Sequence, residues 1–514
     1  MAQTRLTPFA KILIVALVVG GVYYGLTKLR DPNVKDKIKG LSTEKGAESK
    51  DGYKDVINIG VVTWGGYAGG QYFNKGFDAN TASQFYKDYG FKVNFKIIDD
   101  FDASRDAFKN GDIDLMWATI DAFPTEVEGL AQYDPQVVFQ ADWSRGGDAV
   151  VVNRGINKVS DLKGKKIAVA PMTPSHSFLI WLLEAGDLSV KDVKIVEVPS
   201  AIDAADAFKS NTVDAAVVWS PDDEDCVNKV AGSKVLESTK HASHIIADVF
   251  VAKKEFIETH KEQMRDLYEG WMKGAAEINT SDTAKREASK ILAKGLNMPE
   301  DYCYNAINNV RLASHGDNMD FFGLNPQYTG VTGEELYNKM KVKYDQLGYG
   351  TANAKSWRLL AAKDLINEIN LSMPGAESEK GKVFTTATTD IKEKEALSTK
   401  QLSISFRSGE YQLDENAKQL IDYQFIPIAK AFSNSRVRIE GNTDNVGSFA
   451  TNVALSKKRA QAVANYLMNE HNMPANRIIV IGNGPSKPVS GCEDNASEDC
   501  KGKNRRTDFE LVND

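Results

Sequence analysis

The stretch from residue 441 to residue 460 places an acidic side chain on a turn and a basic side chain on a helix. Asp444 lies in the turn, and Arg459 follows fifteen positions later. A carboxylate and a planar guanidinium at a fixed separation suit a zwitterionic ligand, because each charge meets its opposite. The pattern is Gly441-Asn442-Thr443-Asp444-Asn445-Val446-Gly447, Asn452, Leu455-Ser456, Arg459-Ala460, Gly482, Gly484, Pro488 and Asn504-Arg505-Arg506.

Around this stretch the sequence predicts a compact α/β domain over residues 401–514. Apolar periodicity indicates strands near 402–406, 436–440, 477–482 and 508–512, with helices over 414–433 and 452–469. The preceding residues 371–400 are rich in Gly, Ser, Thr, Glu and Lys and are predicted to form a linker.

The quoted pattern resembles the OmpA-like peptidoglycan-binding domain over about residues 402–514. That resemblance implies that Asp444 and Arg459 clasp the amino and carboxylate groups of diaminopimelate in the stem peptide. It also implies that Thr443, Asn452, Leu455, Ser456, Arg505 and Arg506 shape or line the pocket. Asn442 departs from the family, which usually has His or another aromatic residue there. The alternative is structural: Asp444 caps a turn and Arg459 lies on a helix face.

From residue 56 onward, strand and helix patterns alternate, which is typical of α/β folds. We expect a parallel sheet with crossover connections, enough strands for two sheets, and mostly helix from residue 253 to about 369. The domain is assigned to residues 55–370. Strands are predicted at 57–63, 92–98, 113–117, 149–152, 166–170, 194–198 and 215–218.

This central region resembles periplasmic solute-binding proteins of the nitrate, sulfonate, taurine and thiamine-precursor type. The resemblance implies two α/β lobes that close over a ligand, with crossing strands near 148–153 and 246–252. It rests on Ile59-Gly60-Val61-Val62-Thr63-Trp64-Gly65-Gly66, Gly111-Asp112-Ile113-Asp114, residues 161–169 (DLKGKKIAV), residues 174–179 (PSHSFL) and residues 213–221 (VDAAVVWSP).

In open α/β sheets, ligands bind beyond the carboxyl ends of the strands, so the residues after each strand are candidates. A helix that starts at 173–175 would direct free amides at an anion, whereas the acidic residues would favour a cation. Both an oxyanion and an amine or zwitterion therefore remain open. The tryptophans are equally compatible with core positions, and His176 is expected to be a structural or contact residue, not a catalyst. The candidates are Trp64, Tyr67, Asp121, Trp143, Asp148, Ser175, His176, Trp219 and Asp222.

The N-terminus carries an apolar run at residues 12–27 with basic residues on both sides. Residues 1–30 are predicted to be a short cytoplasmic tail and a transmembrane helix, and 31–54 a linker. The alternative is a cleaved signal peptide, but no Ala-x-Ala site follows the run. We therefore expect a single-pass inner-membrane protein with its bulk in the periplasm.

The composition and the cysteines limit the partners. A 514-residue chain with a net charge of −7 is a poor match for nucleic acid. Cys492 and Cys500 are the expected disulfide, and the sequence predicts no metal site and no cofactor.

The leading hypothesis is a non-enzymatic protein that binds a small solute in its central cleft and peptidoglycan through its last domain. It would act as a tethered receptor or a transport or signalling component with a membrane protein partner. The alternative is a peptidoglycan-anchored, stator-like subunit whose central domain binds proteins. An enzyme is a third possibility, although no acid/base pair can be named.

Overall fold

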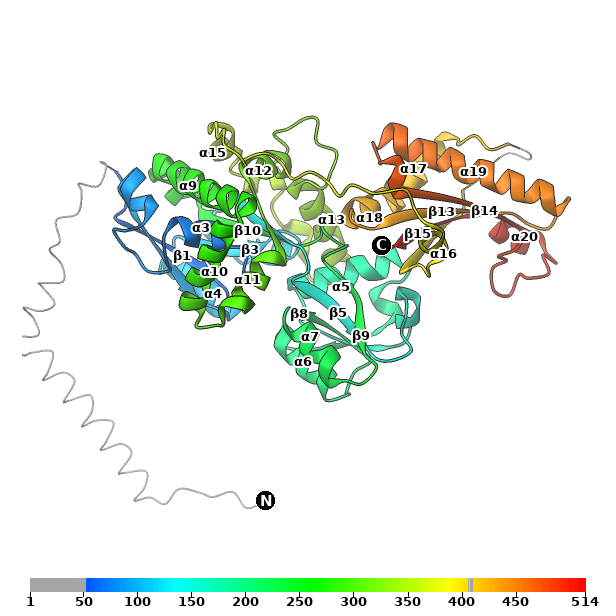
Figure 1. The fold of residues 1–514 in the computed structure, drawn as a ribbon, viewed down its shortest axis with the longest axis horizontal. Helices are drawn as coiled ribbons and strands as arrows, with labels where there is room; N and C mark the ends of the chain where they lie inside the picture. The colour runs from blue at the N-terminus through cyan, green and yellow to red at the C-terminus, as the bar shows by residue number, and fades with distance from the viewer. Residues whose placement is uncertain (1–51, 405, 407–409) are drawn as a thin grey trace, which may run out of the picture. The chain divides into compact units, whose positions relative to one another are not determined.

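The computed structural model describes residues 52–404, 406 and 410–514. The expected membrane anchor and most of the first linker lie outside these residues. Among the described residues, no helix combines the length and the apolar character that a membrane crossing needs. Their strands form three sheets, two in the central domain and one in the C-terminal domain (Figure 1).

The first sheet has six strands in the order β11-β4-β10-β3-β1-β2. β1 is parallel to β2 and β3, whereas β10 is antiparallel to β3 and β4. The expected parallel sheet is thus only partly correct. Parallel neighbours are joined by crossover connections within a lobe, whereas β10 enters the sheet when the chain returns from the second lobe and runs antiparallel to its neighbours. In that order the bounds are Val310–Leu312, Pro135–Ser144, Ala247–Lys253, Leu115–Thr119, Val56–Val61 and Lys92–Ile97.

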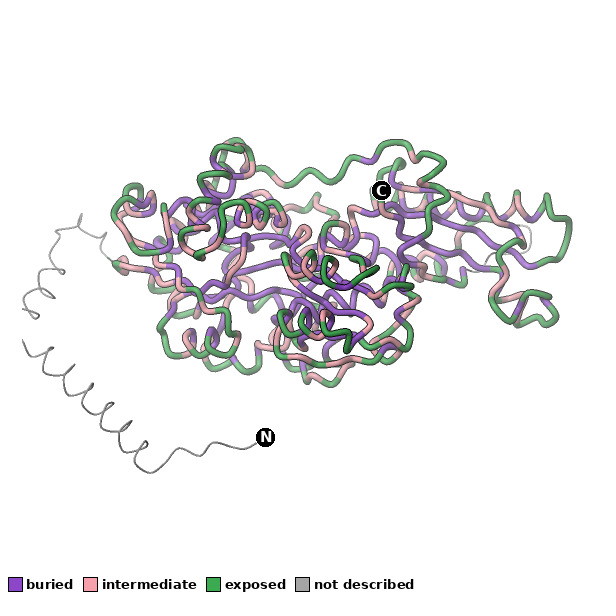
Figure 2. Tube along the Cα trace, turned by 60° about the horizontal axis from the view of Figure 1, so that its bottom comes forward, coloured by how far each residue is buried: buried purple, intermediate pink, exposed green. Residues whose placement is uncertain are grey.

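The second sheet has five strands in the order β7-β6-β8-β5-β9. β6 is parallel to β7 and β8, and β5 is antiparallel to β8 and β9. Buried residues concentrate in the strands, and exposed residues lie on outer helices and loops (Figure 2). The strand bounds are Lys194–Glu197, Lys166–Val169, Ala215–Trp219, Asp148–Val152 and Lys234–Ser238; its helices are α5 (Pro174–Ala185), α6 (Ala201–Lys209) and α7 (Asp222–Lys229).

The chain passes between these two sheets at residues 145–147 and 239–246. The predicted crossings are placed slightly too late, because residues 148–152 and 247–253 already belong to β5 and β10. Thr239 joins the two crossings: its hydroxyl accepts a hydrogen bond from Gly146 N at 2.8 Å and lies 2.8 Å from the hydroxyl of Ser144. This hydroxyl therefore holds the two connections together.

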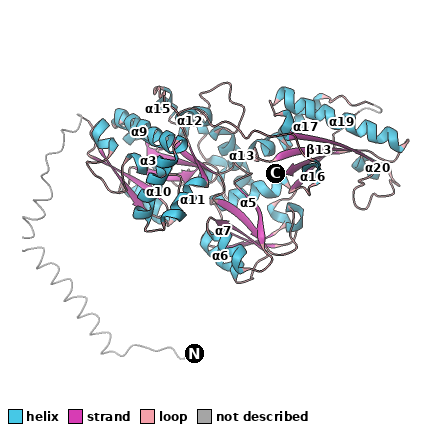
Figure 3. Cartoon of the chain, in the orientation of Figure 1, coloured by secondary structure: helices cyan, strands magenta, loops and turns pink. Residues whose placement is uncertain are grey.

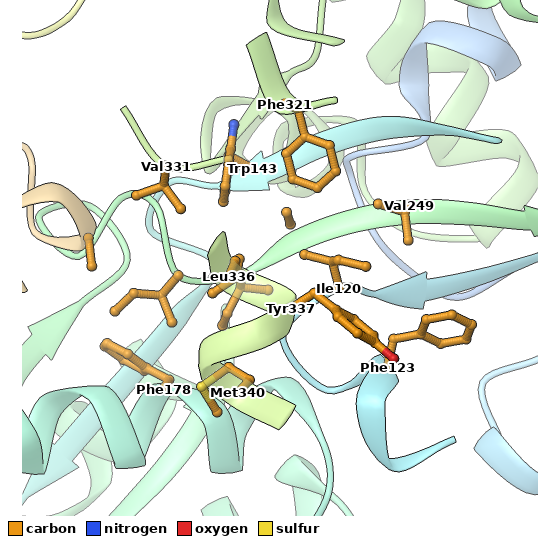
Figure 4. Packing of buried hydrophobic residues seen from close by; sticks show 14 of the residues in the cluster. Ile120, Phe123, Trp143, Phe178, Val249, Phe321, Val331, Leu336, Tyr337 and Met340 are labelled. Carbon is orange, nitrogen blue, oxygen red and sulfur yellow. The ribbon is translucent and has the colours of Figure 1, made fainter. Parts of the chain in front are cut away.

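The rest of the central domain is mainly helical, as expected, apart from β11 (Figure 3). Helix α13 packs Leu336, Tyr337 and Met340 into the apolar core, close to Phe178 of α5 (Figure 4). The helices are α3 (Ala68–Phe73), α4 (Phe101–Asn110), α8 (Lys254–Thr259), α9 (Lys261–Thr280), α10 (Asp282–Leu296), α11 (Glu300–Asn308), α12 (His315–Phe321), α13 (Gly333–Gln346), α14 (Trp357–Leu360) and α15 (Lys363–Asn367), with a π-helix at Phe85–Tyr89.

The C-terminal domain has a four-stranded sheet in the order β12-β15-β13-β14. The long helix α19 lies close to β13 and β14, where only glycine fits: a Cβ on Gly441 would lie 2.2 Å from the carbonyl oxygen of Ser456, and one on Gly482 2.6 Å from Lys457. The strands are Ser398–Leu402, Thr507–Val512, Arg436–Asn442 and Ile478–Gly484; the helices are α16 (Thr389–Glu393), α17 (Glu415–Gln424), α18 (Ile426–Ala431), α19 (Phe449–Glu470) and α20 (Glu498–Asn504).

Three predictions of secondary structure in this region need correction. The helix expected over 414–433 is two helices separated at Phe425, because Pro427 in the next turn has no N–H to donate. The strand expected at 402–406 ends at Leu402. The expected linker at 371–400 contains α16 and the start of β12.

Candidate functional sites

A cleft of about 1120 Å³ opens between the two lobes of the central domain. Its walls are the segments that follow the parallel strands, as expected for α/β sheets. The first lobe contributes the segment after β1 and the start of helix α4. Asp100 caps this helix, and its carboxylate accepts a hydrogen bond from Ala103 N at 2.7 Å. The lining includes Thr63, Phe101, Arg105, Thr173, Ser200, Trp219, Asp222 and Tyr302.

A smaller cavity of about 30 Å³ adjoins the cleft, and the two share Val62, Thr63 and Trp219. That volume is enough for one or two water-sized groups. The indole N–H groups of Trp117 and Trp219 have no acceptor in the described part of the chain. The full lining of this inner cavity is Val62, Thr63, Trp64, Trp117, Thr119, Asp148, Pro174, Trp219, Ile246 and Asp248.

Four buried aspartates surround the crossing between the lobes: Asp121, Asp142, Asp148 and Asp248. Strand pairing brings them together, because Asp248 on β10 lies directly opposite Asp142 on β4 and Thr119 on β3. None of the four pairs with a Lys or Arg within 4.0 Å among the described residues. None of the four is therefore paired directly with a cation, although the charges of Arg145 and Arg105 oppose part of the rise in the pKa values of Asp142 and Asp248.

Each of three aspartates accepts one side-chain hydrogen bond. Tyr67 Oη donates to Asp248 at 2.5 Å, Trp64 Nε1 donates to Asp142 at 3.0 Å, and Ser144 Oγ donates to Asp148 at 2.7 Å. Neither oxygen of Asp121 receives a hydrogen bond of normal geometry, although Ser177 lies close enough to oppose the rise of its pKa.

Burial makes these carboxyl groups weak acids. It raises the pKa of Asp121 to about 8 and the pKa values of Asp148 and Asp248 to about 7. The pKa of Asp142 is also raised, first by burial and then by the negative charge of Asp248. Near neutral pH the site therefore holds a mixture of protonated and ionised aspartates.

At the start of helix α5, two of the amides that the sequence suggested for an anion are already used within the chain. The backbone N–H groups of His176 and Ser177 both donate to Thr173 O, at 3.0 and 3.1 Å. Burial lowers the pKa of His176 to about 4, so its ring is neutral at pH 7, and its Nδ1 accepts a hydrogen bond from Met172 N at 3.2 Å. His176 is thus a structural residue of this turn.

In the C-terminal domain, Asp444 and Arg459 are both nearly buried, with 8% and 7% of their surfaces exposed. Asp444 lies in the turn between β13 and α19, where it accepts hydrogen bonds from Val446 N at 3.1 Å and Arg505 Nη1 at 2.6 Å. Burial lowers the pKa of Arg459, and the nearby negative charge of Asp444 opposes that shift. The two groups are therefore electrostatic neighbours.

Among the described residues, only Nε of the Arg459 guanidinium has a hydrogen-bond acceptor, which leaves its two Nη groups for a ligand. Its Nε donates to Glu410 O at 3.1 Å, and the guanidinium carbon lies 4.8 Å from the centre of the Phe406 ring. Asn452 holds the turn by donating to Val446 O at 3.0 Å, and Ser456 Oγ accepts a hydrogen bond from Gly484 N at 2.9 Å.

Comparisons with known proteins divide the chain in the same way. Residues 405–502 match the model of the OmpA family, and residues 79–293 match that of the NMT1-like family. The chain joins an NMT1-like domain to an OmpA-family domain. Both resemblances inferred from the sequence are thereby confirmed.

Individual relatives match one domain each. Outer membrane porin F of Pseudomonas aeruginosa is 34% identical over 115 residues, which is 22% of this chain and 31% of that protein. The taurine-binding periplasmic protein of Escherichia coli is 29% identical over 192 residues, 36% of this chain and 58% of that protein. The chain thus spans less than two thirds of the length of either curated relative.

A similar solved structure is the periplasmic aliphatic sulphonate binding protein SsuA from Escherichia coli. It shares 18% identity, covers 61% of this chain and 100% of its own, and has a TM-score of 0.47.

In the NMT1-like domain, the structure brings together only some of the predicted ligand residues. Trp64, Asp148 and Trp219 line the inner cavity, and Asp222 lines the cleft with Trp219. Tyr67 and Asp121 lie behind the cavity wall, where Tyr67 supports Asp248. Ser175 and His176 are buried within the turn that starts α5.

Trp143 is a core residue and not part of the cleft. Its ring centre lies 5.7 Å from that of Phe321 and 4.9 Å from that of His244, within the apolar cluster that also holds Val331 (Figure 4). The sequence suggested a place near the cleft because Trp143 precedes the first crossing. Its side chain points to the opposite face of β4 from Asp142, as alternation along a strand requires.

Sequence reasoning missed Trp117, Asp142 and Asp248. Trp117 falls inside a predicted strand, and neither aspartate follows one, so none of the three is a candidate by position alone. A signal is nevertheless present: Asp142 and Asp248 are single charges inside strands of otherwise apolar texture. A charge within a buried strand requires a partner or a function.

In the OmpA-family domain, the two predicted arginines have different environments. Arg505 pairs with Asp444, whereas Arg506 is buried against Asp508, with Nε 2.9 Å from its carboxylate, and also donates to Lys487 O. Thr443 is buried with its hydroxyl unpartnered, and Leu455 is half-buried. Asn442, the departure from the family pattern, donates to the same Asp508 at 2.9 Å.

Cys492 and Cys500 form a disulfide with an S–S distance of 2.01 Å. Cys226 and Cys303 are buried, unpaired, and lie in separate apolar clusters. Among the described residues, no group of three His, Cys, Asp or Glu side chains could hold a metal ion.

Proposed function

We propose that this chain is a solute-binding protein of the bacterial cell envelope that is held to peptidoglycan by its C-terminal domain. The observation that carries the proposal is the presence, on one chain, of an open interlobe cleft and a nearly buried Asp444–Arg459 pair in an OmpA-family domain. The pair suits the ammonium and carboxylate groups of a diaminopimelate stem peptide. The cleft suits a solute that the lobes close upon.

Binding is favoured over catalysis by the chemistry of the cleft. The four aspartates at the crossing are buried, and the neutral His176 is held by its own turn. Thr63 and Ser200 donate to the exposed carboxylates of Asp99 and Asp203, but among the described cleft residues no hydroxyl is paired with a His or Lys base, and we assign no acid/base sequence.

The apolar run at residues 12–27 would supply an inner-membrane anchor, leaving the two domains in the periplasm. A membrane protein partner would then receive the solute or the closed state of the lobes, because a binding protein alone cannot move a solute across a membrane. The same layout would allow the wall-binding domain to fix the receptor in position.

Wall binding is tested by co-sedimentation of the purified chain with isolated sacculi. We expect Asp444→Ala and Arg459→Ala each to abolish co-sedimentation, because each removes one half of the clasp. Lys457→Ala is the matched control: it removes an exposed charge from the same helix and should leave binding intact. Normal co-sedimentation of both clasp variants, with circular dichroism showing them folded, would refute the assignment.

A further inference from the structure

The charge of the solute can be inferred from the walls of the cleft, an inference that rests on the proposed solute-binding function. The larger cleft is lined by six acidic and two basic residues. Both basic residues have an acidic partner, Arg105 with Glu126 at 2.6 Å and Lys109 with Asp106 at 3.1 Å, although Arg105 Nη1 has no acceptor among the described residues. The cleft therefore presents a net negative potential. Its acidic residues are Asp99, Asp100, Asp102, Glu126, Asp203 and Asp222.

The lining of the inner cavity favours a positively charged ligand more strongly than that of the cleft does. Asp148 and Asp248 line it, no basic residue does, and their exposed fractions are 2% and 5%. One oxygen of each is satisfied, by Ser144 and Tyr67 respectively. No donor among the described residues reaches the other oxygen of either carboxylate. Two carboxylate oxygens therefore open onto one small cavity, where the donors of a ligand can reach them.

The other walls suit an organic cation better than an anion or a metal. Three tryptophans, Trp64, Trp117 and Trp219, line the cavity, and indole faces attract cations. Metal binding is disfavoured because the described residues contain no group of three ligands. At the start of α5, Thr173 O already takes the His176 and Ser177 N–H groups and Pro174 has none, so only the Ser175 N–H is left there for an anion.

We propose that the solute carries an alkylammonium group, whose N–H donors bind Asp148 and Asp248 in the inner cavity while the rest of the solute occupies the adjoining cleft. A protonated primary amine supplies the donors that these oxygens lack, and its positive charge offsets theirs. The free indole N–H groups of Trp117 and Trp219 are then left for an acceptor elsewhere on the solute.

The test uses the full-length protein and three probes with one carbon chain: n-butylammonium chloride, n-butanol and sodium n-butanesulfonate. Binding is measured at millimolar concentrations from tryptophan fluorescence and from the melting temperature at constant ionic strength. We expect n-butylammonium alone to bind. Asp148→Asn and Asp248→Asn, which keep side-chain shape, should each weaken it by roughly tenfold or more.

The matched control is Asp112→Asn, which removes the same charge from an exposed position outside the cleft and should change the affinity by less than about twofold. Preferential binding of butanesulfonate or butanol would overturn the inference while leaving solute binding intact. Equal binding of n-butylammonium by the wild type and both cavity variants would overturn the assigned site. Failure of all three probes and of a broad panel of larger solutes would overturn the proposed function itself.

Discussion

Asp148 and Asp248 are buried carboxyl groups whose burial costs stability. Each is nearly removed from water without a cationic partner, so the protein accommodates them in its interior by raising their pKa values to about 7. A structural carboxylate would have gained an arginine or a lysine. Their unsatisfied state is what one expects of groups that await a ligand.

These pKa values predict a pH dependence of stability. Each group has a pKa near 7 when folded against a model value of 3.8, so the folded state binds more protons between these values. The free energy of unfolding should therefore decrease as the pH rises from about 4 to about 8, by the order of a few kcal/mol. Asp121 and Asp142 act in the same direction. The charged groups that face this pair are Asp121, Asp142, Asp223, Arg105 and Arg145.

Urea unfolding followed by tryptophan fluorescence measures this effect, because all seven tryptophans belong to the central domain. The double variant Asp148→Asn/Asp248→Asn serves as the reference, since it cannot titrate at these positions and should show a flatter profile. A wild-type profile that matches the double variant from pH 5 to pH 8 would contradict the assigned protonation states.

The contact between helix α19 and strands β13 and β14 places the wall-binding pair. Asp444 follows β13 and Arg459 lies on α19, so their separation depends on how closely the helix approaches the sheet. That approach is permitted by glycines at the contact, as the close distances at Gly441 and Gly482 show. The packing distance between the helix and the sheet thus decides whether Asp444 and Arg459 form one site.

Gly441→Ala tests this dependence. Its Cβ would lie 2.2 Å from the carbonyl oxygen of Ser456, and backbone cannot yield as a flexible side chain does. We expect α19 to shift, with a loss of about 1 to 3 kcal/mol in stability and a clear loss of sacculus binding. Hydrogen exchange of β13 and α19 would report the first effect, and co-sedimentation the second.

Gly381→Ala is the control for this substitution, because a Cβ at Gly381 has nothing within 4 Å. It should leave both exchange and co-sedimentation unchanged. Wild-type sacculus binding by Gly441→Ala would show that the clasp tolerates a displaced helix, contrary to our expectation.

The two lobes of the central domain are joined by short crossings that share one side chain. Thr239 accepts hydrogen bonds from Gly146 N and Asp148 N and lies beside Ser144, whose hydroxyl in turn supports Asp148. The same hydroxyl network therefore links the connection between the lobes to a carboxylate of the inner cavity. A movement of one lobe would therefore change the hydrogen bonds around Asp148.

Thr239→Val should loosen this connection, because it keeps the side-chain shape and removes the hydroxyl that three groups use. We expect faster hydrogen exchange at residues 144–148 and 239–246, with the central strands of both sheets unchanged. Thr239→Ser restores the hydroxyl and should restore protection. Equal exchange in Thr239→Val and the wild type would show that the crossings are held by other contacts.

Alternating patterns of strand and helix in the sequence are sufficient to predict the α/β class, and the spaced residues around Asp444 and Arg459 are sufficient to indicate the OmpA-family domain. Such features depend on local periodicity and on motif spacing, which the sequence displays directly.

Which residues share a site depends on the tertiary structure. Folding buries Trp143 in the core and His176 in a turn, and it brings Asp248 opposite Asp142 across two strands that are about a hundred residues apart in sequence. Antiparallel pairing at the crossing cannot be deduced from local patterns, because register between distant strands is set by the packing of both lobes. Local sequence patterns thus specify the kind of each domain and the wall-binding pair, whereas long-range strand pairing creates the acidic cavity where we place the solute.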